Sequence, residues 1–346
     1  MKSARISAVA LALLVGGSLA LSGCAGSSTP ASSPAATEDA QPALVDEAKA
    51  EGAVTWYTQL AEDRARVAAD GFTAMYGIPV QIVRAPSATL MQRFTAERDA
   101  GAPVADLIDY SGVEPFRDAE EGDFLDIAEE GVPAAETWPD DAIIAGTAPR
   151  LSLDSFVIAY NTDLVSGDDI PKTWEDVFNP PISETVAHPK WDSSVLYLEV
   201  LQFLKDTYGE EFLEDFAKLD STEYESGVPA MQAVAAGEHA ALFPTGASFV
   251  IPLMESGAPV DFTVPSPAPG ISVYAAVPFD GPHTKAGLLL LDYLMTVEGQ
   301  QLLNEGVSVS ALPDVPGTLE LSEFVPVDRD EVIANQEELL ALVSAR

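Results

Sequence analysis

Residues 43–110 alternate between short apolar runs and segments with helical spacing. The apolar runs, which are typical of buried strands, lie at 54–57, 79–83 and 105–110. The segments with helical spacing lie at 43–52, 61–76 and 87–100. We expect Val67, Phe72 and Met75 to form the apolar face of the second helix and Ser87 to cap the third. Strands that alternate with helices predict a parallel sheet covered on both faces.

The second half of the chain contains two longer extended runs, 149–160 and 271–278, which we expect to cross between two lobes. Further helices are predicted at 192–205, 210–218, 228–236, 246–255, 284–295, 297–306 and 328–344, and further strands at 239–243 and 260–264. The expected first lobe comprises residues 43–154 and 272–325, and the second comprises 155–271 and 326–346. We expect the hinge near residues 155–160 and 271–275.

The N-terminus has a different pattern, in which Lys2 and Arg5 precede an apolar run at 6–21 that is too short for a stable membrane span. Leu21, Ser22, Gly23 and Cys24 follow, and they resemble a bacterial lipobox. Residues 1–23 are therefore expected to be a lipoprotein signal peptide, with Cys24 as the acylated residue. Residues 24–42, rich in Ala, Ser, Thr and Pro, are expected to be a flexible tether. These features predict an extracytoplasmic protein anchored to the cell membrane by lipid.

Composition excludes several classes of function. The 55 acidic and 17 basic residues give a formal charge of −38, which repels nucleic acid because phosphate binding needs basic patches. Cys24 is the single cysteine, so its acylation leaves no thiol for a disulfide, a metal site or a nucleophile. His188, His239 and His283 are the histidines, and no Gly-x-Ser-x-Gly or His-Glu-x-x-His motif occurs after the signal peptide. We therefore expect no catalytic residues, although a secreted, lipid-anchored enzyme remains an alternative.

Several segments together resemble bacterial extracellular solute-binding proteins of the iron(III) type. They begin with Glu-Gly-Ala-Val-Thr-Trp-Tyr-Thr at 51–58, Phe-Thr-Ala-Met-Tyr-Gly-Ile-Pro-Val at 72–80 and Leu-Met-Gln-Arg-Phe-Thr-Ala-Glu at 90–97. Later segments agree in order and spacing, including Tyr-Asn-Thr at 160–162, Pro-Lys-Thr-Trp-Glu-Asp at 171–176 and Ala-Ala-Gly-Glu at 235–238. The resemblance covers nearly the whole chain after the tether.

The resemblance implies an α/β fold with two lobes, of the type II or Venus-flytrap class of periplasmic binding proteins, with two crossing hinge strands. It also implies a monomeric receptor, without a cofactor, that delivers a small solute to the permease of an ABC importer. The chain has no phosphate-binding Gly-Lys-Ser/Thr loop, so the ATPase is expected to be a separate subunit.

Candidate ligand-binding residues follow from the rule that ligands bind at the carboxyl ends of the strands, near the N-termini of the next helices. In the first lobe this rule selects Tyr57, Thr58, Gln59, Ser87, Ala88, Thr89, Tyr110, Ser111 and Gly112. In the second lobe it selects Ser193, Ser194, Thr245, Gly246 and Ser248. Arg84 and Arg93 are candidate counter-charges. Amide donors at helix N-termini suit a carboxylate, phosphate or phosphonate group.

The predicted site departs from the pattern of the iron-binding members, which use two adjacent tyrosines together with a histidine and a carboxylate. Residues 245–249 read Thr-Gly-Ala-Ser-Phe, and Gln59 follows Tyr57 and Thr58. Hard ferric iron favours phenolate, carboxylate and imidazole donors, which are missing at these positions. The sequence thus favours an acidic organic solute and no metal, with ferric iron as the alternative.

Overall fold

The computed structural model describes residues 40–120 and 122–344 of the chain. The signal peptide, Cys24 and most of the tether lie outside these residues. Within the described part, no helix is both long and apolar enough to cross a membrane.

The first lobe is built on three parallel strands in the order β2, β1, β3. Its strands are β1 (Val54–Thr58), β2 (Val80–Arg84), β3 (Leu107–Ser111) and the short β4 (Ile143–Ile144). Its helices are α1 (Ala40–Glu51), α2 (Glu62–Tyr76), α3 (Ser87–Asp99), α4 (Glu114–Arg117), α9 (Thr284–Leu294) and α10 (Val297–Asn304). Strand β1 is buried along its whole length because Trp56 and Tyr57 pack into two different cores. The predicted parallel sheet is therefore confirmed, and both of its faces are covered at β1.

The second lobe contains the parallel strands β7, β6 and β8, and β9 pairs with the far half of β5. Its strands are β6 (Val186–Pro189), β7 (Ser221–Tyr224), β8 (Ala241–Gly246) and β9 (Val260–Thr263). Its helices are α5 (Val195–Tyr208), α6 (Glu210–Phe216), α7 (Gly227–Ala235), α8 (Ala247–Glu255) and α11 (Arg329–Ser344). Trp174, Phe203 and Phe243 meet edge to face in its main core.

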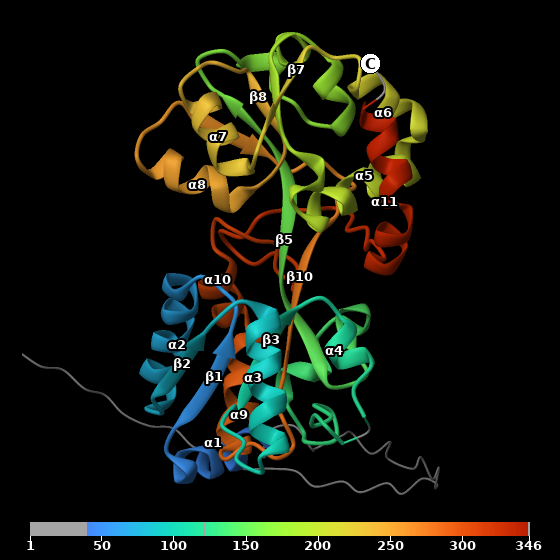
Figure 1. The fold of residues 1–346 in the computed structure, drawn as a ribbon. Helices are drawn as coiled ribbons and strands as arrows, with labels where there is room; N and C mark the ends of the chain where they lie inside the picture. Colours follow the sequence, from blue (N-terminus) through green and yellow to red (C-terminus); the bar gives the residue numbers. More distant parts are fainter. Residues whose placement is uncertain (1–39, 121, 345–346) are drawn as a thin grey trace, which may run out of the picture. The chain divides into compact units, whose positions relative to one another are not determined.

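Two antiparallel strands, β5 (Ala148–Asn161) and β10 (Gly270–Ala276), connect the two lobes (Figure 1). Strand β10 pairs with β3 of the first lobe, whereas β5 pairs with β8 and β9 of the second from Phe156 onward. The strands pass between the lobes at Asp154 and Ser155, which face Ile271 and Gly270. The two-lobed α/β fold with crossing strands is confirmed. The point where the strands leave one lobe and enter the other lies at the edges of the two predicted hinge segments. Most residues of those segments pair within the sheets of the lobes.

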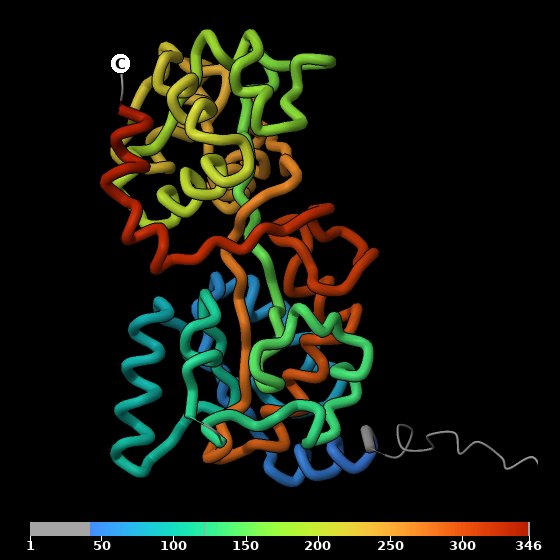
Figure 2. The backbone as a smooth tube through the Cα atoms, turned by 90° about the vertical axis from the view of Figure 1, so that its right-hand side faces the viewer, coloured from blue at the N-terminus to red at the C-terminus, as the bar shows by residue number. Residues whose placement is uncertain are grey.

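A third connection runs between α10 and α11 and passes the crossing strands, as the red segment in Figure 2 shows. Val309 bridges Leu153 of β5, and Phe324 bridges Ala268 just before β10. This segment has no regular secondary structure over most of its length, so periodicity gave no sign of its path.

Two local predictions for the first lobe are wrong. Val67 and Met75 of α2 are each 50% exposed, and the buried face of α2 consists of Ala65, Ala68, Ala69 and Phe72. Small alanines let α2 pack closely against α10, so the larger apolar side chains are left outside. Ser87 is the first residue of α3 and not its cap, which is Pro86.

Candidate functional site

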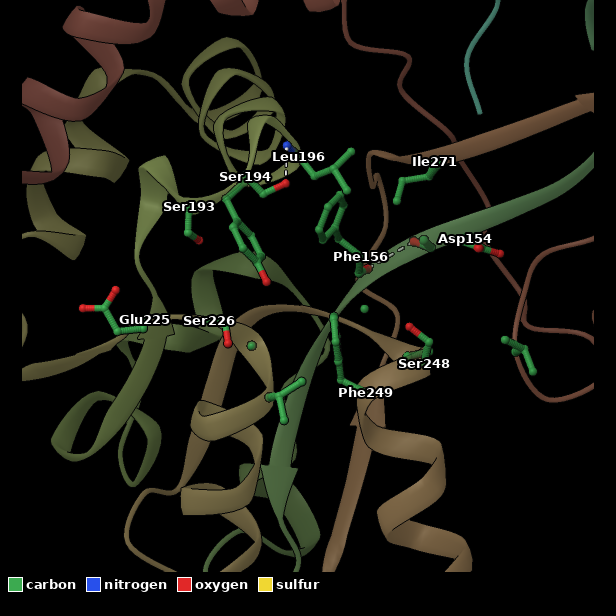
Figure 3. A pocket seen from close by; sticks show the side chains of 17 residues that line it. Asp154, Phe156, Ser193, Ser194, Leu196, Glu225, Ser226, Ser248, Phe249 and Ile271 are labelled. Atoms are coloured by element: carbon green, nitrogen blue, oxygen red, sulfur yellow. Dashed lines mark hydrogen bonds between the residues drawn. The ribbon is translucent and has the colours of Figure 1, made fainter. Parts of the chain in front are cut away.

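A cavity of about 330 Å³ lies where three helices of the second lobe begin. Its walls include Ser194, Ser226 and Gly246, which are the N-cap residues of α5, α7 and α8. Figure 3 shows Ser194, Ser226 and Ser248 on different elements around this space. Each helix start leaves backbone N–H groups without helical partners and carries the positive end of the helix dipole. Three such starts around one cavity favour a negatively charged group.

The local sequence explains why two of these helices begin at the cavity. Ser194 is extended, and its Oγ accepts a hydrogen bond from the backbone N–H of Leu196 at 3.3 Å. Ser226 is also extended, and Pro229 lies in the first turn of α7, where its missing N–H breaks no helical hydrogen bond. Gly227 leaves room for Tyr197, since a Cβ at this position would lie 3.0 Å from the Tyr197 hydroxyl.

Aromatic side chains form the apolar part of the same cavity, which is lined by Phe156, Tyr197 and Phe249. Burial raises the pKa of the Tyr197 hydroxyl, and a hydrogen bond with the backbone of Gly227 partly opposes this shift. The phenol therefore stays protonated at neutral pH. The cavity combines aromatic walls with neutral hydroxyl donors, and its lining also includes the carboxylates of Asp154 and Glu225.

A second cavity, of about 590 Å³, adjoins the first, and both are lined by Asp154, Ser248 and Val307. First-lobe residues on its walls include Gln59, Leu60 and Arg64. Second-lobe residues on its walls are Ser248, Ile251, Pro252 and Glu255. The two cavities thus share part of their walls at the crossing strands.

The structure brings together five of the residues selected from the sequence. Ser193, Ser194, Gly246 and Ser248 line the first cavity, and Gln59 and Ser248 line the second. Thr245 precedes Gly246 but is fully buried, and its hydroxyl has no hydrogen-bond partner among the described residues.

The first-lobe candidates on β1 face the protein interior. Tyr57 is fully buried, and its hydroxyl donates to the two carboxylate oxygens of Glu97 at 2.8 and 2.9 Å. The guanidinium of Arg93 lies 4.9 Å from the centre of the Tyr57 ring and donates to Glu97 at 2.7 Å. Thr58 is buried, and its Oγ1 accepts from the N–H of Leu60 at 3.1 Å. These side chains support the end of β1 and line neither cavity.

The remaining first-lobe candidates also lie outside the two cavities. They form two neighbouring turns, Ser87, Ala88 and Thr89 at the start of α3, and Tyr110, Ser111 and Gly112 at the end of β3. The two turns are linked because Ser111 N–H donates to Ser87 Oγ at 3.4 Å. Ala88 and Thr89 are exposed, whereas the other four residues are half-buried.

Asp109 holds the loop that carries Gln59. Its Oδ1 accepts from the backbone N–H of Gln59 at 3.0 Å, and its Oδ2 accepts from Trp56 Nε1 at 2.9 Å. Burial raises the pKa of Asp109 to about 6, although hydrogen bonds from Thr58, Gln59 and Trp56 oppose this shift. The ionised carboxylate is therefore the less stable form in the folded protein below about pH 6.

We expect Asp109→Asn to change the pH dependence of folding stability. Because the pKa of Asp109 is raised in the folded state, the unfolded chain loses this proton first, so ionisation destabilises the fold as pH rises from 4 to 6. The variant cannot ionise there. Its free energy of unfolding, measured by denaturant titration, should therefore improve relative to wild type by roughly 1 to 3 kcal/mol over that range. A constant difference across this pH range would contradict the raised pKa.

The sequence predicted the helix α7 but did not indicate that its start, or the aromatic residues of the cavity, belong to the site. Strand β7 has the sequence Ser-Thr-Glu-Tyr, which is short and polar. It therefore contains no apolar run from which a strand, and a ligand-binding turn after it, could be predicted. The available signal was local, a serine followed by a proline three residues later at Ser226 and Pro229.

Comparison with known proteins agrees with the two-lobed fold. Residues 50–301 match the family model described as bacterial extracellular solute-binding protein. A putative extracellular solute-binding protein from Bordetella parapertussis has a similar fold, with a TM-score of 0.67 and 18% identity over 85% of this chain and 98% of that one. Iron-bound HitA from Pseudomonas aeruginosa gives a TM-score of 0.60 and 18% identity over 83% and 99% of the two chains.

A further similar structure is the Trichodesmium protein IdiA (FutA) in complex with iron and citrate, with a TM-score of 0.61 and 18% identity over 84% of this chain and 98% of that one. No match was found among the curated proteins. At this identity the solved structures show the shared fold and not the ligand. The family match spans most of the sequence, and the chain belongs to the bacterial extracellular solute-binding protein family.

Proposed function

We propose that this protein is the lipid-anchored receptor of an ABC importer and that it captures a small acidic organic solute between its two lobes. The observation that carries this proposal is the meeting of α5, α7 and α8 at one cavity, because three helix N-termini leave amide groups without helical partners and provide a positive potential. Delivery would go to a membrane permease driven by separate ATPase subunits.

Because the protein as a whole is strongly acidic, an acidic solute needs a local site that offsets this charge. The formal charge of −38 repels an anion at a distance, so binding depends on close contacts. The two arginines considered as counter-charges do not supply them. Arg93 is paired with Glu97, Arg84 donates to the carbonyl of Leu60, and neither lines the two cavities. The helix N-termini are therefore the groups we assign to the acid.

Ferric iron is the second candidate, because two of the similar structures contain iron according to their descriptions. Residues 245–249 lack a tyrosine pair, and no group of three or more His, Cys, Asp or Glu residues in the described part is placed to hold a metal ion. These residues fit ferric iron poorly, because its preferred phenolate, carboxylate and imidazole donors are not gathered at the site.

A thermal-shift screen tests the proposal against iron. Carboxylates, phosphonates, polyamines and ferric citrate are each added to the purified protein, and the unfolding midpoint is measured. An acid present at a hundred times its dissociation constant should stabilise the fold by about 2.7 kcal/mol. Stabilisation by ferric citrate and not by citrate alone, with a tyrosinate absorption band, would establish iron and overturn the acidic solute.

The anchor is tested separately with Cys24→Ser. We expect the substituted protein to appear in the medium, because no acyl chain holds it to the membrane, while solute binding is unchanged. Immunoblots of membrane and medium fractions measure the distribution. Retention of the variant in the membrane fraction would contradict the anchor, although it would leave the binding proposal intact.

A further inference from the structure

Asp154 lies at the junction of the two cavities and the two lobes. It is one of the three residues that line both cavities, and it lies where β5 passes between the lobes. Its side chain is 38% exposed, so the carboxylate is open to a ligand. In Figure 3, Asp154 lies on β5 at the opposite side of the cavity from Glu225.

One oxygen of Asp154 is fully engaged by the protein. Oδ1 accepts hydrogen bonds from Arg64 Nη1 at 3.2 Å, from Ser152 Oγ at 3.2 Å and from Ser308 Oγ. Among the described residues no donor reaches Oδ2. The carboxylate is therefore held in one orientation with its second oxygen available.

Arg64, which holds this carboxylate, is itself fixed by further hydrogen bonds. Its Nε donates to the carbonyl of Leu303 at 2.5 Å, and its Nη2 donates to Ser152 and to Asn304 at 2.5 and 2.9 Å. Its side chain is only 10% exposed. The arginine thus orients Asp154, and the protein already uses four of its five N–H groups.

We propose that Oδ2 of Asp154 accepts a hydrogen bond from an amino group of the solute, so that the solute is an acid that also carries an amine. This inference rests on the proposed function, since the acid group would bind at the starts of α5, α7 and α8. The negative charge of Asp154 and the acidic protein around it favour an ammonium group at this end. Asp154 is then a specificity-determining residue at the crossing strands.

The variant Asp154→Asn tests this role with little change in structure. Arg64, Ser152 and Ser308 all donate, so they hold the amide oxygen of the asparagine, and its NH₂ group then takes the position of Oδ2. The variant would present a donor where wild type presents an acceptor. Glu223→Gln is the matched control, because Glu223 is an exposed carboxylate of the same chain that lines neither cavity.

Calorimetric titrations compare matched ligands with and without the amine, namely 4-aminobutanoate with butanoate and 3-aminopropylphosphonate with propylphosphonate. We expect wild type and Glu223→Gln to prefer an amino member by about tenfold or more, and Asp154→Asn to lose that preference. If wild type binds the acids with and without the amine equally well, or if Asp154→Asn keeps the preference for the amine, this inference is overturned and the proposed acidic solute still stands. Failure of all four ligands to bind would overturn it together with the acidic solute.

Discussion

Replacing Ser248 by aspartate is expected to weaken binding of an acidic solute at least a hundredfold. Ser248 is exposed, lies in the first turn of α8 and lines both cavities. A carboxylate there would neutralise the positive end of the helix and repel the solute's acid. Two like charges about 4 Å apart near a protein surface repel by about 4 kcal/mol, which exceeds the 2.7 kcal/mol of a hundredfold change.

Ser248→Asn is the matched control, because asparagine has nearly the size of aspartate without its charge. Both variants should fold, and aspartate in the first turn of a helix is stabilising, so the unfolding midpoint of the Asp variant should not fall. Titration calorimetry of both variants with an acid that binds wild type measures the difference. Equal affinities would contradict the assignment of the acid to this helix start, and tighter binding of ferric citrate by the Asp variant would favour iron.

Replacing Gly299 by alanine is expected to destabilise the fold by about 3 kcal/mol. Alanine normally stabilises a helix relative to glycine, but a Cβ on Gly299 would lie 2.0 Å from the backbone oxygen of Tyr293 and 2.8 Å from Leu294 Cα. This carbonyl also accepts from the backbone and the hydroxyl of Thr296 at 3.0 and 2.7 Å. The backbone therefore cannot move aside without losing these bonds.

Val297→Ala, in the same helix, provides the control because Val297 is 54% exposed and its truncation leaves no buried space. Denaturant unfolding should place this variant within about 0.5 kcal/mol of wild type. If Gly299→Ala were as stable as this control, the close approach of α10 to the end of α9 would be contradicted.

The sequence allowed the long elements to be predicted because their periodicity is strong. The crossing strands and the helices from α5 to α11 have apolar faces or caps that can be recognised without the structure. Strands β6 and β7 were missed because each is only four residues long and β7 is also polar. Their burial and pairing depend on neighbours from distant parts of the chain, which local patterns do not contain.

The candidate site was predicted better in the second lobe than in the first. The strand-end rule selected Ser194, Gly246 and Ser248, all of which line the cavity. The same rule selected Tyr57, whose ring points into the core because side chains alternate along a strand. Asp154 was not selected, because its position at the passage between the lobes depends on pairing between β5 and β10 that no local pattern indicates.

Solution scattering of the purified protein, with and without the acid that stabilises it most, tests the central claim most directly. A solute held between the lobes should favour a closed form, because a ligand shifts such an equilibrium only by binding the two forms unequally. We expect the radius of gyration to fall when the acid saturates the protein, and to stay unchanged with an equal concentration of a polyamine. An unchanged radius at proven saturation would contradict capture of the solute by closure of the two lobes.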